Sequence, residues 1–284
     1  MEPPSMLYSQ LKVHDFYQIL CFLTMNFLGS RSKSPLPFFF MCCGSMNVLI
    51  GYRTGLPISR VGIPLVFKSS FVKANRTSSK SFGGLGMVEV LKILEKVKVA
   101  YDLPIVIDVH DSIQCEVVGR IADIIQITAF LCRQTDLLIV AAKTEKIIHV
   151  KKGQFCAPSV MANLAEKVQL AGNPNVMVCE RGTMFRYNDL IFDPRNLEWM
   201  REANCPILDG GGVASGGLRE LIPCIVRTAV AIGVDGIFME VHDDLLSAPI
   251  DGPTQWVSCY LSKSFKFIGH HFANIYFFFD ASEY

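Results

Sequence analysis

Basic side chains follow short apolar runs at several separate places in the sequence. Lys68 follows PLVF, Lys151 follows KIIHV, and Arg181 follows NVMVCE. Lys73 lies in a polar stretch just after the first of these runs. Arginine binds phosphate or carboxylate groups through two parallel hydrogen bonds, and lysine binds them as a point charge. Because the chain has a net charge of only +1, these cations predict a pocket for an anionic, phosphorylated ligand.

Further polar or aromatic residues end or follow other apolar runs of the same kind: Asp108, His110, Gln126, Phe130 and Glu240. Structural roles compete with binding roles here, since a strand-end lysine is often solvated and Asp108 or His110 could cap a turn. Side chains alternate between the two faces of a strand. We therefore expect at most one of Lys151 and Lys152 to point inward.

The elements that must position these residues are short strands separated by helical patterns. In Met87–Tyr101, for example, Val88, Leu91, Leu94 and Val97 recur at helical spacing. Continuous apolar strands alternating with helices indicate a parallel sheet covered on both faces. We expect seven strands, at residues 37–42, 64–69, 104–110, 123–127, 146–152, 175–181 and 236–241.

Seven strands are one short of an α/β fold of the (β/α)8 TIM barrel type, and the missing strand can be located. Two helical patterns lie between the last two strands, at Leu197–Ala203 and Leu218–Ile232. Between them stands only Cys205–Leu208, followed by Asp209 and three glycines, which is shorter than the usual strand of about 5–6 residues. We predict a barrel with a truncated seventh strand. An open, doubly wound seven-strand sheet is the alternative. In a barrel, the polar strand ends gather at one end, where such folds place their active sites.

Composition excludes several classes of protein. With 27 Lys+Arg against 26 Asp+Glu, the near-neutral charge argues against a nucleic-acid or membrane-surface protein, since those carry basic stripes. Its ten cysteines form no C-x-x-C pair, which favours free thiols in a reducing, cytoplasmic compartment. The apolar segment Phe16–Leu28 is shorter than the ~20 residues of a membrane-spanning helix. We expect neither nucleic acid nor membrane as a partner.

The motifs KANRTSS and FLCRQTDLL, with VKKGQFCAPSVM and GIFMEVHDD, closely resemble the 3-deoxy-8-phosphooctulonate synthase (Kdo-8-phosphate synthase) family in its plant-like form. The resemblance covers roughly residues 62–256. It implies a (β/α)8 barrel, a homotetramer and small phosphorylated substrates. The implied reaction is an aldol-like condensation of phosphoenolpyruvate with arabinose 5-phosphate that releases phosphate.

The resemblance also implies roles for residues. Lys73, Asp108 and Lys151 match catalytic positions. The matching substrate-binding positions are Asn47, Lys68, Asn75, Arg76, Thr77, Gln126, Phe130 and Arg181.

One position after the first strand separates metal-dependent members of this family, which have Cys, from metal-independent members, which have Asn. Asn47 implies that no metal is used, because a divalent ion would lose its thiolate ligand. Glu240 and Asp251 match the remaining metal-type positions of the metal-dependent relatives. We expect no cofactor.

The chain also departs from the family. The D-x-T-H segment of the seventh strand is absent, and the first helix shrinks to Tyr52–Arg60. We expect an atypical N-terminal segment (1–35), a barrel domain (36–256) and an atypical C-terminal segment (257–284). Two alternatives to the family activity follow. One is a catalytically dead member or aberrant gene product that acts at most as an assembly partner, and the other is a Schiff-base aldolase using Lys151 or Lys152.

Overall fold

The computed structural model describes eight stretches of the chain: residues 40–43, 66–74, 80, 83–186, 189–210, 219–242, 256–257 and 277–281. All of them lie in one of the chain's two units, Leu36–Tyr284. The shortened first helix expected at Tyr52–Arg60 and the apolar segment Phe16–Leu28 lie outside these residues. No helix within these stretches has both the length and the apolar character needed to cross a membrane.

The strands coincide with the predicted apolar runs. They are β1 (Phe40–Cys43), β2 (Val66–Ser69), β3 (Ile105–Val109), β4 (Ile124–Ile127), β5 (Ile147–Lys151), β6 (Val176–Glu180), β9 (Ile207–Asp209) and β10 (Gly236–His242). The predicted truncation of the seventh strand is confirmed, because β9 has three residues.

Helices follow most of these strands. They are α4 (Met87–Tyr101), α5 (Cys115–Gly119), α6 (Thr135–Ala142), α7 (Val160–Leu170), α8 (Arg195–Trp199) and α9 (Ile222–Ile232). The helix α4 has the predicted bounds and buries Val90, Leu91, Leu94 and Val97. Val88, which we expected on that face, is 67% exposed.

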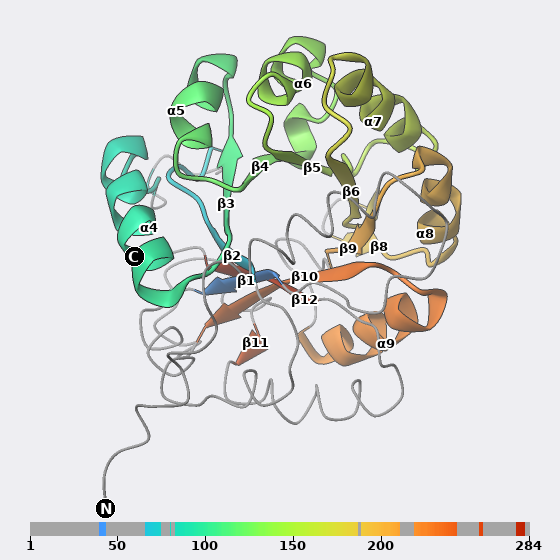
Figure 1. The fold of residues 1–284 in the computed structure, drawn as a ribbon. Coiled ribbons are helices and arrows are strands. Elements are labelled where there is room, and N and C mark those ends of the chain that lie inside the picture. The colour runs from blue at the N-terminus through green and yellow to red at the C-terminus, as the bar shows by residue number, and fades with distance from the viewer. Residues whose placement is uncertain are drawn as a thin grey trace, which may run out of the picture. The chain divides into compact units, whose positions relative to one another are not determined.

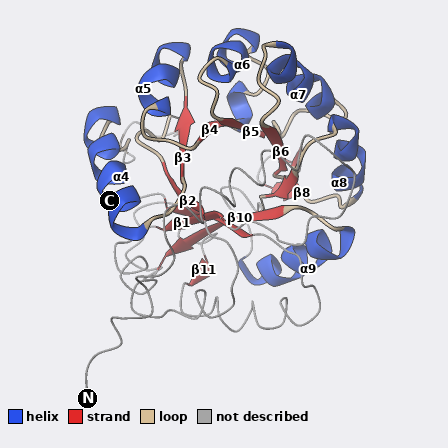
Figure 2. Ribbon diagram, viewed as in Figure 1, coloured by secondary structure: helices blue, strands red, loops and turns tan. Residues whose placement is uncertain are grey.

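The strands form a parallel barrel with the helices outside it (Figures 1 and 2). Consecutive pairs run from β3 through β4, β5, β6 and β9 to β10, and β1 joins β10 to β2. The backbone N–H of Phe67 in β2 donates to the carbonyl of Pro104, just before β3, at 2.8 Å. These contacts bring the ends of the sheet together, so the barrel prediction is confirmed and the open-sheet alternative is wrong.

Four further strands complete the described part. An antiparallel hairpin, β7 (Thr183–Arg186) with β8 (Asp189–Ile191), follows β6, and the short β11 (Trp256–Val257) pairs with β10. The strand β12 (Phe277–Ala281) pairs with β10 and β2, and its pairings overlap those of β1 at residues 238–240 of β10 and at Phe67 of β2. The sequence analysis did not predict β12, because its aromatic run has neither helical nor alternating polarity.

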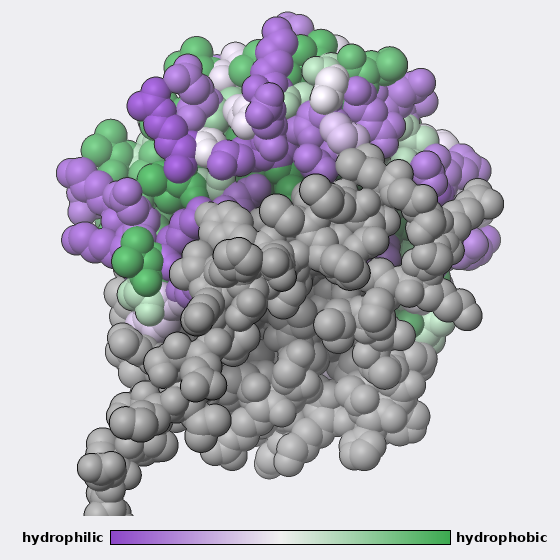
Figure 3. Space-filling model, in the orientation of Figure 1, coloured by the Kyte–Doolittle hydropathy of each residue, from purple (hydrophilic) through white to green (hydrophobic). Residues whose placement is uncertain are grey.

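In the barrel strands whose burial is described, β2 to β6, β9 and β10, alternate residues belong to two different cores. One set lies inside the barrel: Val66, Val106, Ile124, Cys179, Leu208 and Phe238. The other set, which includes Ile107, Ile125 and Val150, packs with the surrounding helices. In the space-filling view, hydrophilic and hydrophobic residues are intermixed on the visible face of the described part (Figure 3). The alternation of side chains along each strand decides which polar residues point into the barrel.

Candidate active site

Asp108 is the centre of the first group of charges at the carboxyl ends of the strands. It lies two residues after Val106, an inward residue of β3, and is 5% exposed. Lys68 Nζ of β2 lies 3.5 Å from its Oδ1, and His110 Nε2 lies 3.4 Å from its Oδ2. Lys68 Nζ also donates to Ser70 Oγ at 2.5 Å. A carboxylate and an ammonium thus meet inside the barrel.

Opposing effects act on the pKa of Asp108. Burial raises the pKa, but Lys68, His110 and Lys73 together outweigh burial and hold it below the usual value. Asp108 is therefore ionised at neutral pH. An ionised carboxylate accepts hydrogen bonds from hydroxyl groups and from water.

Lys151 provides the second group. Its Nζ lies 3.4 Å from the centre of the Phe238 ring, which belongs to β10 across the barrel. This contact shows that Lys151 points inward, and an ammonium over an aromatic face is held by the ring quadrupole. Burial lowers the pKa of Lys151 to about 7, an effect that Cys179 partly offsets and that Lys68 and Arg181 reinforce. Three cations therefore act on one another here, and a bound anion would relieve their repulsion.

His149 lies beneath Lys151 on the same face of β5. It is fully buried, and its ring centre is 6.0 Å from that of Phe238. Burial, with Lys151 and Lys68, holds the pKa of His149 well below its usual value, so the imidazole is neutral. The sequence analysis missed His149. Its spacing of two residues from Lys151 was the signal that could have found it.

Two other predicted residues differ in exposure. Gln126 of β4 is 2% exposed, and its Oε1 has no hydrogen-bond partner within the described residues. Gln126 is in register with Asp108 and His149 on the neighbouring strands. Phe130, in the turn after β4, is 54% exposed. An amide inside the barrel and a ring at its rim are both available to a ligand.

The described residues do not include every predicted site residue. Asn47, Asn75, Arg76, Thr77 and Asp251 all lie outside them. Glu240 lies on β10, two residues after Phe238. Within the described stretches, no group of three or more His, Cys, Asp or Glu side chains could hold a metal ion.

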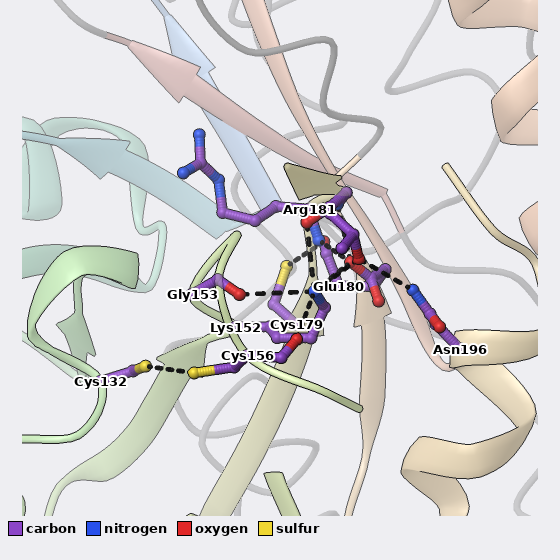
Figure 4. A network of polar contacts seen from close by, with 10 residues as sticks. Cys132, Lys152, Gly153, Cys156, Cys179, Glu180, Arg181 and Asn196 are labelled. Carbon is purple, nitrogen blue, oxygen red and sulfur yellow. Dashed lines mark hydrogen bonds and ion pairs between the residues drawn. The ribbon is translucent and has the colours of Figure 1, made fainter. Parts of the chain in front are cut away.

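Lys152 points out of the barrel, which agrees with the expected alternation. Its Nζ forms an ion pair with Glu180 at 3.2 Å. Figure 4 shows this pair together with the carbonyl oxygens of Gly153 and Cys156, which also face the Lys152 ammonium. The sequence analysis did not predict this pair, because no pattern links a lysine on one strand with a glutamate on the next.

Comparison with known proteins identifies the family. Residues 54–274 match the model of the DAHP synthetase I family. The chain belongs to the DAHP synthetase I family. Among family members, the 2-dehydro-3-deoxyphosphooctonate aldolase of Pisum sativum is 78% identical over 271 residues, which are 90% of this chain and 88% of that protein.

Two further relatives carry the same enzyme name. The 2-dehydro-3-deoxyphosphooctonate aldolase 1 of Arabidopsis thaliana is 78% identical over 213 residues, 70% of this chain and 73% of that protein. The protein of Acidithiobacillus ferrooxidans (strain ATCC 53993 / BNL-5-31) is 43% identical over 248 residues, 82% and 88% of the two chains. That name is a synonym of Kdo-8-phosphate synthase. The predicted membership of this branch of the DAHP synthetase I family is confirmed.

Proposed function

We propose that this chain is a 3-deoxy-8-phosphooctulonate synthase, a transferase of Kdo biosynthesis. It condenses phosphoenolpyruvate with D-arabinose 5-phosphate and yields Kdo-8-phosphate and phosphate. The observation that carries the proposal is that Lys68, paired with Asp108, and Lys151, over the ring of Phe238, both lie inside the barrel of a chain 78% identical to the Pisum sativum enzyme.

The chemistry suits a basic pocket. The methylene carbon of phosphoenolpyruvate forms a bond with the aldehyde carbon of the sugar, one water is consumed, and inorganic phosphate leaves. Lys68, Lys151, Arg181 and Gln126 hold the phosphate and carboxylate of phosphoenolpyruvate. Cations fixed in a buried site orient both reactants and stabilise charge without reorganising solvent.

Each catalytic residue has a distinct task. Lys151, whose pKa burial lowers to about 7, is held in the charged form by the bound anion and remains charged during the reaction. Asp108, ionised by its neighbours, accepts hydrogen bonds from the sugar hydroxyls. Lys73 is the third catalytic residue, and its charge helps to keep Asp108 ionised.

The sugar phosphate occupies the outer part of the site. Asn75, Arg76 and Thr77 bind its phosphate, and the exposed ring of Phe130 lines the entrance. Asn47 replaces a metal ligand, so the reaction needs no metal and no cofactor. Glu240 and Asp251 then serve structure or order water.

We further propose the arrangement that the family resemblance implies. The chain is cytoplasmic and forms a homo-oligomer, a tetramer as in the family. Its barrel domain spans 36–256, between atypical segments at 1–35 and 257–284. Small phosphorylated molecules are its partners, and nucleic acid and membranes are not.

A phosphate-release assay tests the function. Purified full-length chain is incubated with both substrates, and controls omit one substrate at a time. We expect phosphate release that requires both substrates. Absence of release under saturating substrate would refute the proposed activity.

A second candidate, a catalytically dead assembly partner, is favoured by the short β9. The family's D-x-T-H segment belongs to this strand, and β9 ends at Asp209 after three residues. This candidate predicts no phosphate release, but co-purification with an active relative expressed in the same cells. Release by the chain alone would exclude it.

A third candidate, the Schiff-base aldolase, is favoured by the pKa of Lys151 near 7, because much of the amine is neutral at neutral pH. Borohydride trapping of a substrate adduct on Lys151 would support it. Lack of an adduct in the wild type would remove it.

A further inference from the structure

An ion pair with no side-chain exposure lies at the carboxyl ends of β5 and β6, outside the barrel. Lys152 Nζ and Glu180 Oε1 are 3.2 Å apart, and both side chains are 0% exposed. Lys152 directly follows Lys151, and Glu180 directly precedes Arg181; Lys151 and Arg181 are both predicted to bind the substrate. Figure 4 shows the Arg181 guanidinium extending away from this pair. Each inward cation is therefore the sequence neighbour of one member of the outer pair: Lys151 of Lys152, and Arg181 of Glu180.

The ammonium of Lys152 joins the loops after β5 and β6. Besides Glu180, it contacts four oxygen atoms: the carbonyls of Gly182 at 3.1 Å, Gly153 at 3.4 Å and Cys156 at 3.4 Å, and Thr183 Oγ1 at 3.3 Å. The backbone N–H of Met184 also donates to the Gln154 carbonyl at 2.9 Å. These contacts fix the two loops relative to each other.

Glu180 fixes the backbone of Arg181 directly. Its Oε1 accepts the N–H of Arg181 at 2.8 Å and that of Gly182 at 2.7 Å. Gly182 has a φ of +87°, which suits glycine and lets both N–H groups face the same carboxylate. The position of the Arg181 side chain therefore depends on Glu180, which Lys152 holds in turn.

A buried ion pair of this kind is a poor source of stability, because removing two charges from water offsets their attraction. Apolar residues of similar volume often stabilise such a site equally well. The pair instead fixes the positions of the groups around it, because each charge has hydrogen-bond partners at defined positions.

We propose that Lys152 and Glu180 are positioning residues that set the spacing of Lys151 and Arg181 for one anionic ligand. The ligand class is a compound with a phosphate and a carboxylate close together, which is the chemistry of phosphoenolpyruvate. This inference rests on the proposed function, which assigns Lys151 and Arg181 to that substrate.

The test replaces the pair by apolar residues, in the double variant K152M/E180L of the full chain. The matched control is K98M/D123L. Lys98 Nζ and Asp123 Oδ1 form a 2.7 Å ion pair, and Asp123 Oδ2 accepts the N–H of Ile105 at the amino end of β3. The control therefore removes an ion pair at the opposite end of the barrel.

We expect K152M/E180L to raise the KM for phosphoenolpyruvate about tenfold, because small displacements of binding groups are costly. The KM for arabinose 5-phosphate should change less than about twofold. The control variant should leave both constants unchanged, even where it lowers the unfolding temperature. Equal changes in both constants, or none, would overturn the positioning role.

Two readouts do not need turnover. Hydrogen exchange should become faster in peptides spanning 153–156 and 181–183, and calorimetry should report weaker binding of phosphoenolpyruvate. A wild type that releases no phosphate would refute the proposed function, whereas unchanged exchange in both loops would refute the positioning role.

If the double variant does not fold, K152R keeps the charge but alters its geometry. We expect K152R to weaken phosphoenolpyruvate binding several-fold, and unchanged binding would overturn the proposal.

Discussion

Replacing Lys151 with methionine tests the electrostatics of the site. A lysine whose pKa falls from 10.5 to about 7 on folding destabilises the folded chain by up to about 5 kcal/mol, since each pKa unit corresponds to about 1.4 kcal/mol. The destabilisation is complete below pH 7, where folded and unfolded chains both carry the charge. It disappears as pH rises towards 10.5, where neither form carries it. K151M should therefore be more stable than the wild type, most of all below pH 7.

Urea unfolding followed by circular dichroism at pH 6.5, 8 and 9.5 measures this difference. We expect K151M to gain a few kcal/mol at pH 6.5, with the gain shrinking at each higher pH. The control, K143M, removes an exposed lysine just after α6 and should match the wild type at every pH. A variant no more stable than the wild type at pH 6.5, or a gain independent of pH, would refute the reasoning. Loss of phosphoenolpyruvate binding in the stabilised K151M would show that the charge serves the ligand rather than the fold.

Three further outcomes are expected. D108N should lower kcat for phosphate release by about 100-fold, whereas D136N, at an exposed residue of α6, should not; equal rates would contradict the role of Asp108. F130A should change the free energy of unfolding by less than about 0.5 kcal/mol, because the ring is 54% exposed, but should raise the KM for arabinose 5-phosphate; an unchanged KM would remove Phe130 from the site. Dialysis against EDTA should leave phosphate release unaffected, as Asn47 implies, and a loss that zinc or manganese restores would show that a metal is used.

Much of the barrel follows from the sequence because parallel strands buried on both faces leave long apolar runs. The runs around Ile107, Ile125 and Val150 gave the strands within one or two residues. Alternation also separated Lys151 from Lys152 correctly. The truncated strand was recognisable because helix patterns on both sides left little sequence between them.

What the sequence did not reveal depends on contacts between distant segments. Phe238 reaches Lys151 across the barrel, and Glu180 meets Lys152 from the next strand, so neither partner appears in a local pattern. His149 was missed because it lies inside an apolar run and resembles an ordinary strand residue. The strand β12 was missed because successive phenylalanines show no alternation of polarity.

The short β9 has a consequence for how the molecule unfolds. It meets β10 over two residue pairs, Leu208 with Gly236 and Asp209 with Ile237. Strands β3 to β6 pair over longer stretches and carry α5, α6 and α7 between them. Cooperativity is weakest where the fewest contacts join two parts of a structure. The junctions β9–β10 and β1–β2 are each joined by only two residue pairs. We therefore expect partial opening to begin at these short junctions and not between β3 and β6.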